Sequence, residues 1–183
     1  MRSPHASSRR RHRLHSLKRL VLYNATDIDN RVHQGVPNMT AEELWDESGL
    51  TGEYEAWAFG GAPDKLAGLV VSGTKTATCS SLALLELEGE PMPKPGDYSV
   101  ILDSADNAVC VIRTTRVYVE AFASVSEEHA FKEGEGDRSL DYWRRVHTEF
   151  FTEELGAAGL PFDENCELVC EEFELAYVPS ASL

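Results

Sequence analysis

The chain has 183 residues, of which 42% are hydrophobic, which is enough for one domain with a core and excludes a wholly disordered protein. It contains no apolar run of the roughly 18 residues that a membrane-spanning helix needs. The basic N-terminus is not followed by an apolar run with a small-residue cleavage site, so we expect no secretion signal and no membrane partner. We predict a cytoplasmic protein.

Charge divides the chain into two parts. Residues 1–38 hold eight lysines and arginines against two acids, whereas residues 39–183 hold nine against 29. We predict that 1–38 is a basic, disordered extension, or a translated upstream region with Met39 as the true start, and that 39–183 is the domain. An excess of about twenty negative charges disfavours binding of a polyanion through a general basic surface, so RNA would need a local pocket or the basic segment.

Four cysteines resemble a reduced set rather than a metal site. They stand at positions 79, 110, 166 and 170, without a CxxC pair or a matching pair of histidines. We predict no metal and no cofactor, and we single out Cys79 because it lies inside the motif described below.

Local signals predict several elements in chain order. Thr40 and Glu43 form a capping box that opens a helix ending at Gly49, and a linker follows. A second helix begins at Pro63 and stops at Ser72-Gly73, whereas the state of residues 82–87 stays open. The remaining predictions are a hairpin over 98–102 and 108–112 with an extended continuation over 114–119, a long helix over 139–155, and a closing strand over 166–178.

The second helix leads into a short polar motif, Gly73-x-Lys75-x-x-Thr78. A lysine can neutralise a phosphate, or act as a base if burial lowers its pKa. A threonine hydroxyl can attack an acyl carbon when a base takes its proton. On spacing alone, a helix end with a solvated lysine is the commoner interpretation.

Two further clusters lie downstream. Three acids alternate with two glycines over 133–137, directly before Ser139, where the glycines allow a tight turn and the acids suit the start of a helix. On the long helix, Trp143 stands beside Arg144 and Arg145, which is compatible with nucleotide stacking and, more commonly, with a core tryptophan. His129 and His147, 18 positions apart, do not by themselves indicate a ribonuclease pair.

Taken together, the motifs resemble the ASCH domain family, which is related to the PUA-like RNA-binding domains, from about Met39 to Val178. The matching segments are Ala62-Pro63-Asp64-Lys65-Leu66-Ala67, Ser72-Gly73-Thr74-Lys75-Thr76-Ala77-Thr78-Cys79-Ser80, Pro95-Gly96-Asp97 and the run EGEGDRSLxxWRxxHxxFF over 133–151. The resemblance implies an α+β fold, a small PUA-like β-barrel with flanking α-helices, and a cleft that holds the GxKxxT segment.

The resemblance also implies chemistry on RNA or on a modified nucleoside. Our first hypothesis is a metal-independent ribonuclease, with Lys75 and either Glu133 or Glu135 catalytic and with Thr78 and Arg138 positioning the phosphate. The second is an amidohydrolase acting on N4-acetylcytidine, in which a Lys75 of depressed pKa activates Thr78 and a glutamate protonates the leaving amine. The third is a binding module without turnover. The expected substrate-binding residues are Gly73, Thr76, Ser80, Arg138, Trp143 and Arg145.

Overall fold

The computed structural model describes residues 38–179, so nearly all of the predicted basic extension lies outside the described residues. Helices and strands alternate irregularly along the chain, as an α+β fold requires. The elements are α1 (Ala41–Ser48), β1 (Tyr54–Ala58), α2 (Pro63–Val71), β2 (Ala77–Ser81), α3 (Leu82–Glu88), β3 (Tyr98–Leu102), β4 (Ala108–Ala121), the short 3-10 turn η1 (Phe122–Ser124), α4 (Glu127–Glu133), α5 (Leu140–Ala157) and β5 (Glu167–Tyr177).

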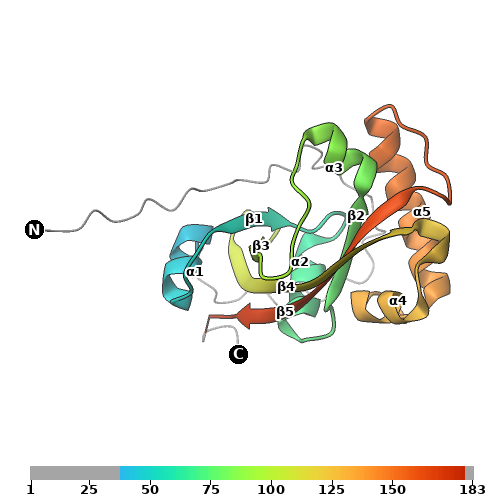
Figure 1. Cartoon of the computed structure of the whole chain (residues 1–183). Coiled ribbons are helices and arrows are strands. Elements are labelled where there is room, and N and C mark those ends of the chain that lie inside the picture. Colours follow the sequence, from blue (N-terminus) through green and yellow to red (C-terminus); the bar gives the residue numbers. More distant parts are fainter. Residues whose placement is uncertain (1–37, 180–183) are drawn as a thin grey trace, which may run out of the picture.

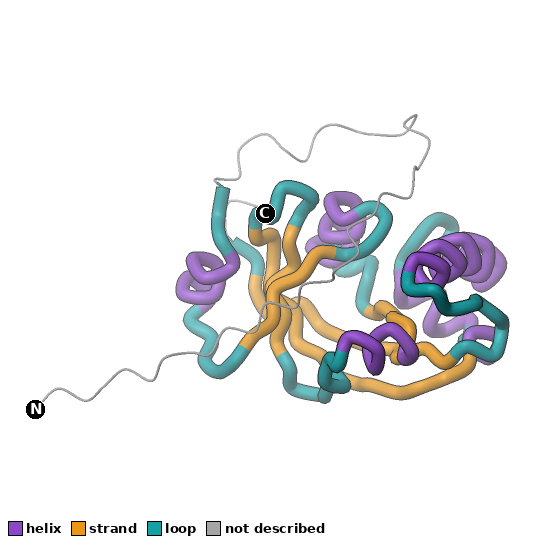
Figure 2. The backbone as a smooth tube through the Cα atoms, turned by 90° about the horizontal axis from the view of Figure 1, so that it is seen from above, coloured by secondary structure: helices purple, strands orange, loops and turns teal. Residues whose placement is uncertain are grey.

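The five strands form one sheet in the order β1-β3-β4-β5-β2. Only the β1–β3 pair is parallel, while β3–β4, β4–β5 and β5–β2 are antiparallel. Register shifts in β4 bend the long central strands, and the sheet curls into a half-barrel, as Figure 2 shows from above. The predicted α+β, PUA-like barrel class is confirmed.

Strong local signals placed several elements correctly. Thr40 accepts a hydrogen bond from the Glu43 amide while the Glu43 side chain accepts from the Thr40 amide, so the predicted capping box opens α1, which ends at Gly49 in the left-handed conformation. Ser139 caps α5 as predicted. The hairpin, its extended continuation and the closing strand are confirmed as β3, β4 and β5.

Weaker local signals were missed or left open. The predicted linker contains β1, which is stabilised by pairing with β3, more than 40 residues away. Residues 82–88 are helical because Ser81 caps them, its hydroxyl accepting from the Leu84 amide. The motif after Thr76 continues as strand β2, and residues before the acidic cluster form α4; neither was predicted.

The two ends of the sheet are covered differently. Figure 1 shows α1 at one end and α4 and α5 at the other. At the α1 end the core is apolar, with Leu44, Trp45, Val100 and Val111 buried together. At the α4–α5 end, aromatic and aliphatic side chains surround several buried polar groups. No helix within residues 38–179 is long and apolar enough to cross a membrane.

Candidate functional site

The turn after α2 delivers Lys75 to the edge of the sheet. Gly73 ends the helix with a φ of 72°, and the amides of Thr74 and Lys75 both donate to the Leu69 carbonyl. The Thr76 amide then donates to the Lys132 carbonyl at 2.7 Å, which ties the start of β2 to the end of α4. The motif therefore lies directly beside the acidic cluster that is separated from it by almost 60 residues.

Gly134 makes this close approach possible. It ends α4 with a φ of 78°, and a Cβ at this position would lie 2.6 Å from the Thr74 carbonyl oxygen. A side chain there would push the acidic loop away from the motif. The prediction that glycines allow a tight turn here is confirmed at this residue.

Lys75 is the centre of the cluster. Its Nζ lies 2.8 Å from Glu133 Oε2 and 3.2 Å from Glu135 Oε1, and it donates to both. The side chains of Lys75 and Glu133 are each 1% exposed, whereas that of Glu135 is 17% exposed. The interpretation of Lys75 as a solvated helix-end lysine is wrong, because two carboxylates compensate its burial.

Three ring nitrogens lie near the other carboxylate oxygen of Glu133. Trp143 Nε1 donates to Oε1 at 3.0 Å, His129 Nε2 lies 3.2 Å away, and His147 Nε2 lies 3.6 Å away. The indole of Trp143 stacks on the His147 ring at 4.2 Å between centroids. Two histidines that are distant in sequence therefore face one carboxylate, which the spacing did not reveal.

Burial and charge act against each other in the pKa values of the site. Burial opposes the ionisation of Glu133, but Lys75, His147 and His129 together hold its pKa well below the ordinary value. Burial likewise lowers the pKa of Lys75, yet Glu133 and Glu135 outweigh it, so the net pKa is raised. For His147, burial prevails and the pKa is lowered. At neutral pH the cluster therefore holds a charged lysine, an ionised Glu133 and a neutral His147.

The raised pKa of Lys75 does not fit an amidohydrolase mechanism in which the lysine is the base. That mechanism needs a lysine whose pKa is depressed, so that the free amine can take a proton. In this arrangement the lysine keeps its proton, because two glutamates contact it. Lys75 is placed to stabilise negative charge rather than to act as a base.

Within residues 38–179, one group of side chains brings together atoms of the kinds that bind metal ions. Ligand atoms of Cys79, Glu133 and His147 lie within 4.8 Å of one another. However, both Glu133 oxygens already accept hydrogen bonds, from Lys75 on one side and from Trp143 and His129 on the other. Burial, and next the neighbouring Glu133, raise the pKa of the Cys79 thiol well above its ordinary value. These residues do not fit a metal ion, and we assign none.

Thr78 does not belong to the Lys75 cluster in this structure. It pairs with Glu171 across β2 and β5, and strand alternation directs it to the face opposite Cys79. Lys75 donates instead to the two glutamates. Ser80 shares the parity of Thr78, and its hydroxyl is buried. The catalytic role of Thr78 and the binding role of Ser80 stay predictions.

The other predicted binding residues are distributed around the acidic loop. Trp143 is 2% exposed, so its ring is a buried support of Glu133 and not a free stacking surface. Arg138 lies with its guanidinium 3.5 Å from the centre of the Phe131 ring, and its amide donates to the Glu135 carbonyl. Arg145 is exposed and lies 5.0 Å from the Tyr142 ring centre.

His129, His147 and Phe131 belong to the site but were not predicted as site residues. His147 lies on the predicted long helix α5, whereas His129 and Phe131 lie on α4, which was not predicted. His129 precedes Glu133 by four positions, and that spacing places two side chains on one helix face. Recognition of α4 would therefore have indicated this pair.

Comparisons with known proteins agree with the fold. A family model for the ASCH domain matches residues 55–177. The chain is similar to the ASCH domain from Lactobacillus crispatus JV V101, with 29% identity, a TM-score of 0.71, and coverage of 80% of this chain and 99% of the other. It is also similar to protein EF3133 from Enterococcus faecalis V583, with 40% identity, a TM-score of 0.66, and coverage of 73% and 86%. A search of curated proteins found no match. The chain belongs to the ASCH domain family.

Proposed function

We propose that this ASCH domain is a hydrolase of a small, uncharged, nucleoside-like substrate such as N4-acetylcytidine. The observation that supports the proposal best is the Glu135 carboxylate, partly exposed and 3.2 Å from a buried, charged lysine. A carboxylate and an ammonium group at this distance can activate a water molecule and stabilise the oxyanion that forms on an amide carbonyl.

The charge of the cluster favours an uncharged substrate. Lys75 contributes one positive charge, while Glu133 and Glu135 each contribute a negative one. The surrounding domain carries a large excess of acids. A phosphate would be repelled at this site, whereas an amide carbonyl would not.

The proposed roles follow from exposure and contacts. Glu135 is the member of the trio that solvent reaches, so it acts as the base that takes a proton from water and returns it to the leaving amine. Lys75 stabilises the oxyanion, and Glu133 holds Lys75 in place from the buried side. In this mechanism the nucleophile is water. Thr78 could act as the nucleophile only if β2 changed conformation, because its side chain is directed to the face opposite Cys79.

An exposed platform next to Glu135 supports a nucleoside as the ligand. Phe131 is 53% exposed, and the Arg138 guanidinium covers its ring at 3.5 Å. The Arg138 amide donates to the Glu135 carbonyl, so the platform adjoins the proposed base. Aromatic rings and arginine planes are the surfaces on which bases stack.

The experiment compares the full-length wild type with Glu135→Gln and Lys75→Arg on N4-acetylcytidine, with chromatographic detection of cytidine. Glu135→Gln should reduce turnover by about 100-fold or more, because the amide cannot take a proton. Glu128→Gln is the matched control, since Glu128 is an exposed glutamate paired with Lys132 outside the cluster. Equal turnover by wild type and Glu135→Gln would overturn the proposal.

A ribonuclease is the second candidate, and the Phe131–Arg138 platform also favours it. In that case the same proteins, incubated with total RNA, should produce Lys75-dependent fragments. Cleavage should be inefficient and should depend only weakly on salt, because the acidic domain leaves few favourable phosphate contacts and the salt dependence scales with their number. If neither substrate changes, a binding module becomes the better hypothesis.

A further inference from the structure

The hydrogen-bond network around Glu133 continues past His129 to a tyrosine at the surface. His129 Nδ1 lies 2.9 Å from the Tyr118 hydroxyl, and His129 Nε2 lies 3.2 Å from Glu133 Oε1. The imidazole is 2% exposed. A hydroxyl, an imidazole and a carboxylate therefore stand in line, with the imidazole held between its two partners.

The ionised state of Glu133 sets which atom donates in each of these hydrogen bonds. Glu133 is ionised, so it only accepts, and His129 Nε2 must carry the hydrogen. In a neutral imidazole Nδ1 is then the acceptor, and the Tyr118 hydroxyl donates to it. Nucleophilic catalysis needs this direction of hydrogen bonding, because His129 Nδ1 can then take the proton of the Tyr118 hydroxyl.

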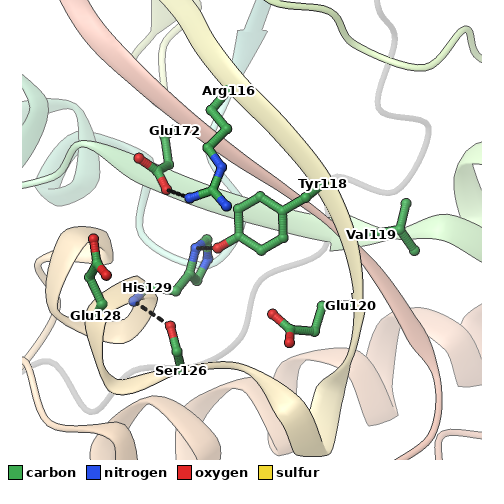
Figure 3. A pocket seen from close by; sticks show the side chains of 8 residues that line it. All are labelled: Arg116, Tyr118, Val119, Glu120, Ser126, Glu128, His129 and Glu172. Atoms are coloured by element: carbon green, nitrogen blue, oxygen red, sulfur yellow. Dashed lines mark hydrogen bonds and ion pairs between the residues drawn. The ribbon is translucent and has the colours of Figure 1, made fainter.

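Tyr118 and His129 also line an open pocket of about 320 Å³. In Figure 3 the Tyr118 ring lies in the middle of the view and its phenolic oxygen points at the His129 ring, with Ser126 below. Ser126 accepts from the His129 amide through its hydroxyl oxygen, so its own hydrogen is available as a donor. The reactive end of the network therefore meets a space large enough for a small substrate.

We propose that Tyr118, His129 and Glu133 form a second catalytic site, in which the Tyr118 hydroxyl attacks small uncharged or cationic carboxylic esters that enter this pocket. Tyr118 is the nucleophile and His129 is the base. Glu133 is a positioning residue that fixes the imidazole tautomer. The site shares Glu133 with the proposed nucleoside hydrolase but does not depend on that activity.

The charges around the pocket select the substrate class. Three glutamates and one arginine line it, namely Glu120, Glu128, Glu172 and Arg116. The excess of acids disfavours phosphate or carboxylate substrates. The Arg116 guanidinium lies 4.6 Å from the Tyr118 ring centre, where it stabilises negative charge that develops on the phenolic oxygen.

The reaction balances without a cofactor. The Tyr118 oxygen attacks the acyl carbon as its proton moves to His129 Nδ1, and the bond to the alcohol breaks as that proton passes to the leaving oxygen. Water then gives a proton to Nδ1 and attacks the acyl-tyrosine, whose phenolic oxygen leaves and regains the proton. The products are a carboxylic acid and an alcohol. An acyl-tyrosine is a phenyl ester, which is a reactive acyl donor.

Burial first, then the neighbouring Cys170 and Glu172, raise the pKa of the Tyr118 phenol well above its ordinary value, with Arg116 acting in the opposite direction. The phenol is therefore protonated at neutral pH and a poor nucleophile by itself. An adjacent base is needed, and His129 supplies it.

The test is covalent labelling of the full-length protein with an uncharged alkyl fluorophosphonate, followed by peptide mass spectrometry. The Tyr118 oxygen should form a bond to phosphorus as fluoride leaves. His129→Gln should slow labelling of Tyr118 by about 100-fold or more, because the base is lost while the tyrosine remains. Tyr177 is the internal control, since its hydroxyl donates directly to Glu47 at 2.8 Å without an imidazole.

A second measurement uses p-nitrophenyl butyrate hydrolysis. Tyr118→Phe should abolish the protein-dependent rate, and Glu133→Gln should lower kcat with little change in KM, because Glu133 does not touch the substrate. A label that is absent from Tyr118, or a His129→Gln variant that labels at the wild-type rate, would overturn the proposal. Neither result bears on N4-acetylcytidine hydrolysis, so the two proposals fail separately.

Discussion

The two ends of the curled sheet bury very different side chains. At the end covered by α1, the helix packs on an apolar cluster in which Leu44 and Val100 are both 0% exposed. At the end covered by α4 and α5, a lysine, a glutamate and two histidines are 8% exposed or less. One end of the sheet is therefore stabilised by apolar packing, whereas the other buries polar groups whose desolvation costs free energy of folding.

This difference separates two physical roles. Apolar burial stabilises a fold without specifying chemistry, at roughly 25 cal/mol per Å² of area removed from water. A buried ion pair contributes little net stability, because desolvation offsets much of its attraction. The polar end is thus where function is expected, and variants at the two ends can separate the two roles.

The largest effect is expected from Glu133→Leu. Loss of this carboxylate removes the shorter of the two carboxylate contacts of Lys75 and the acceptor that His129 and Trp143 share, and we expect the free energy of unfolding to fall by about 3–5 kcal/mol. The double variant Lys75→Met/Glu133→Leu should recover part of that loss, because it also removes the buried positive charge that Glu133 compensated. Urea denaturation of both variants provides the measurement. A double variant no more stable than the single one would mean that the pair itself stabilises the fold.

At the apolar end, Leu44→Ala should lower the free energy of unfolding by about 2–5 kcal/mol through the cavity it leaves. Activity per folded molecule should not change, because Leu44 is remote from Lys75 in the fold. Leu87→Ala is the matched control, since Leu87 is 63% exposed and its loss should cost less than about 0.5 kcal/mol. A selective loss of turnover in folded Leu44→Ala would contradict the division of roles.

Glu154 on α5 provides a contrast with Glu133, because burial and the neighbouring Glu88 and Glu153 raise its pKa to about 7. The folded protein therefore binds an extra proton between the unfolded pKa and about 7, and stability falls as pH rises through that window. Glu154→Gln removes this loss and should stabilise the protein by about 1–3 kcal/mol at alkaline pH, with little effect near pH 4.

Thermal unfolding at the two pH values measures the effect of Glu154→Gln. Glu149→Gln serves as the control, because Glu149 is an exposed glutamate on the same helix and is not among the neighbours that raise the pKa of Glu154. If Glu154→Gln stabilised equally at both pH values, the titration of this carboxyl would not be the cause.

The smallest effect concerns the start of α1. Thr40→Ala removes the acceptor of the Glu43 amide, so the free energy of unfolding should fall by about 1 kcal/mol. Thr152→Ala is a suitable comparison, because the Thr152 hydroxyl donates to the carbonyl of Thr148 within α5 and caps nothing. Equal losses in urea denaturation would show that the capping box is not the source of the effect.

Elements with local signals could be predicted from the amino-acid sequence. Thr40 and Glu43 predict the start of α1, Ser139 predicts the start of α5, and alternating apolar residues predict β3, β4 and β5. The GxKxxT segment and the run over 133–151 were sufficient to indicate the ASCH family and its fold class. These features depend on residues within a few positions of each other, which is the range that spacing describes.

Which side chains meet depends on contacts that form only in the folded protein. Lys75 contacts both Glu133 and Glu135, 58 and 60 positions away, so both candidate acids belong to one cluster. Thr78, only three positions from Lys75, is directed to the other face of β2. The pairing of β2 with β5 and the packing of α4 set these contacts, and both depend on partners that are remote in sequence.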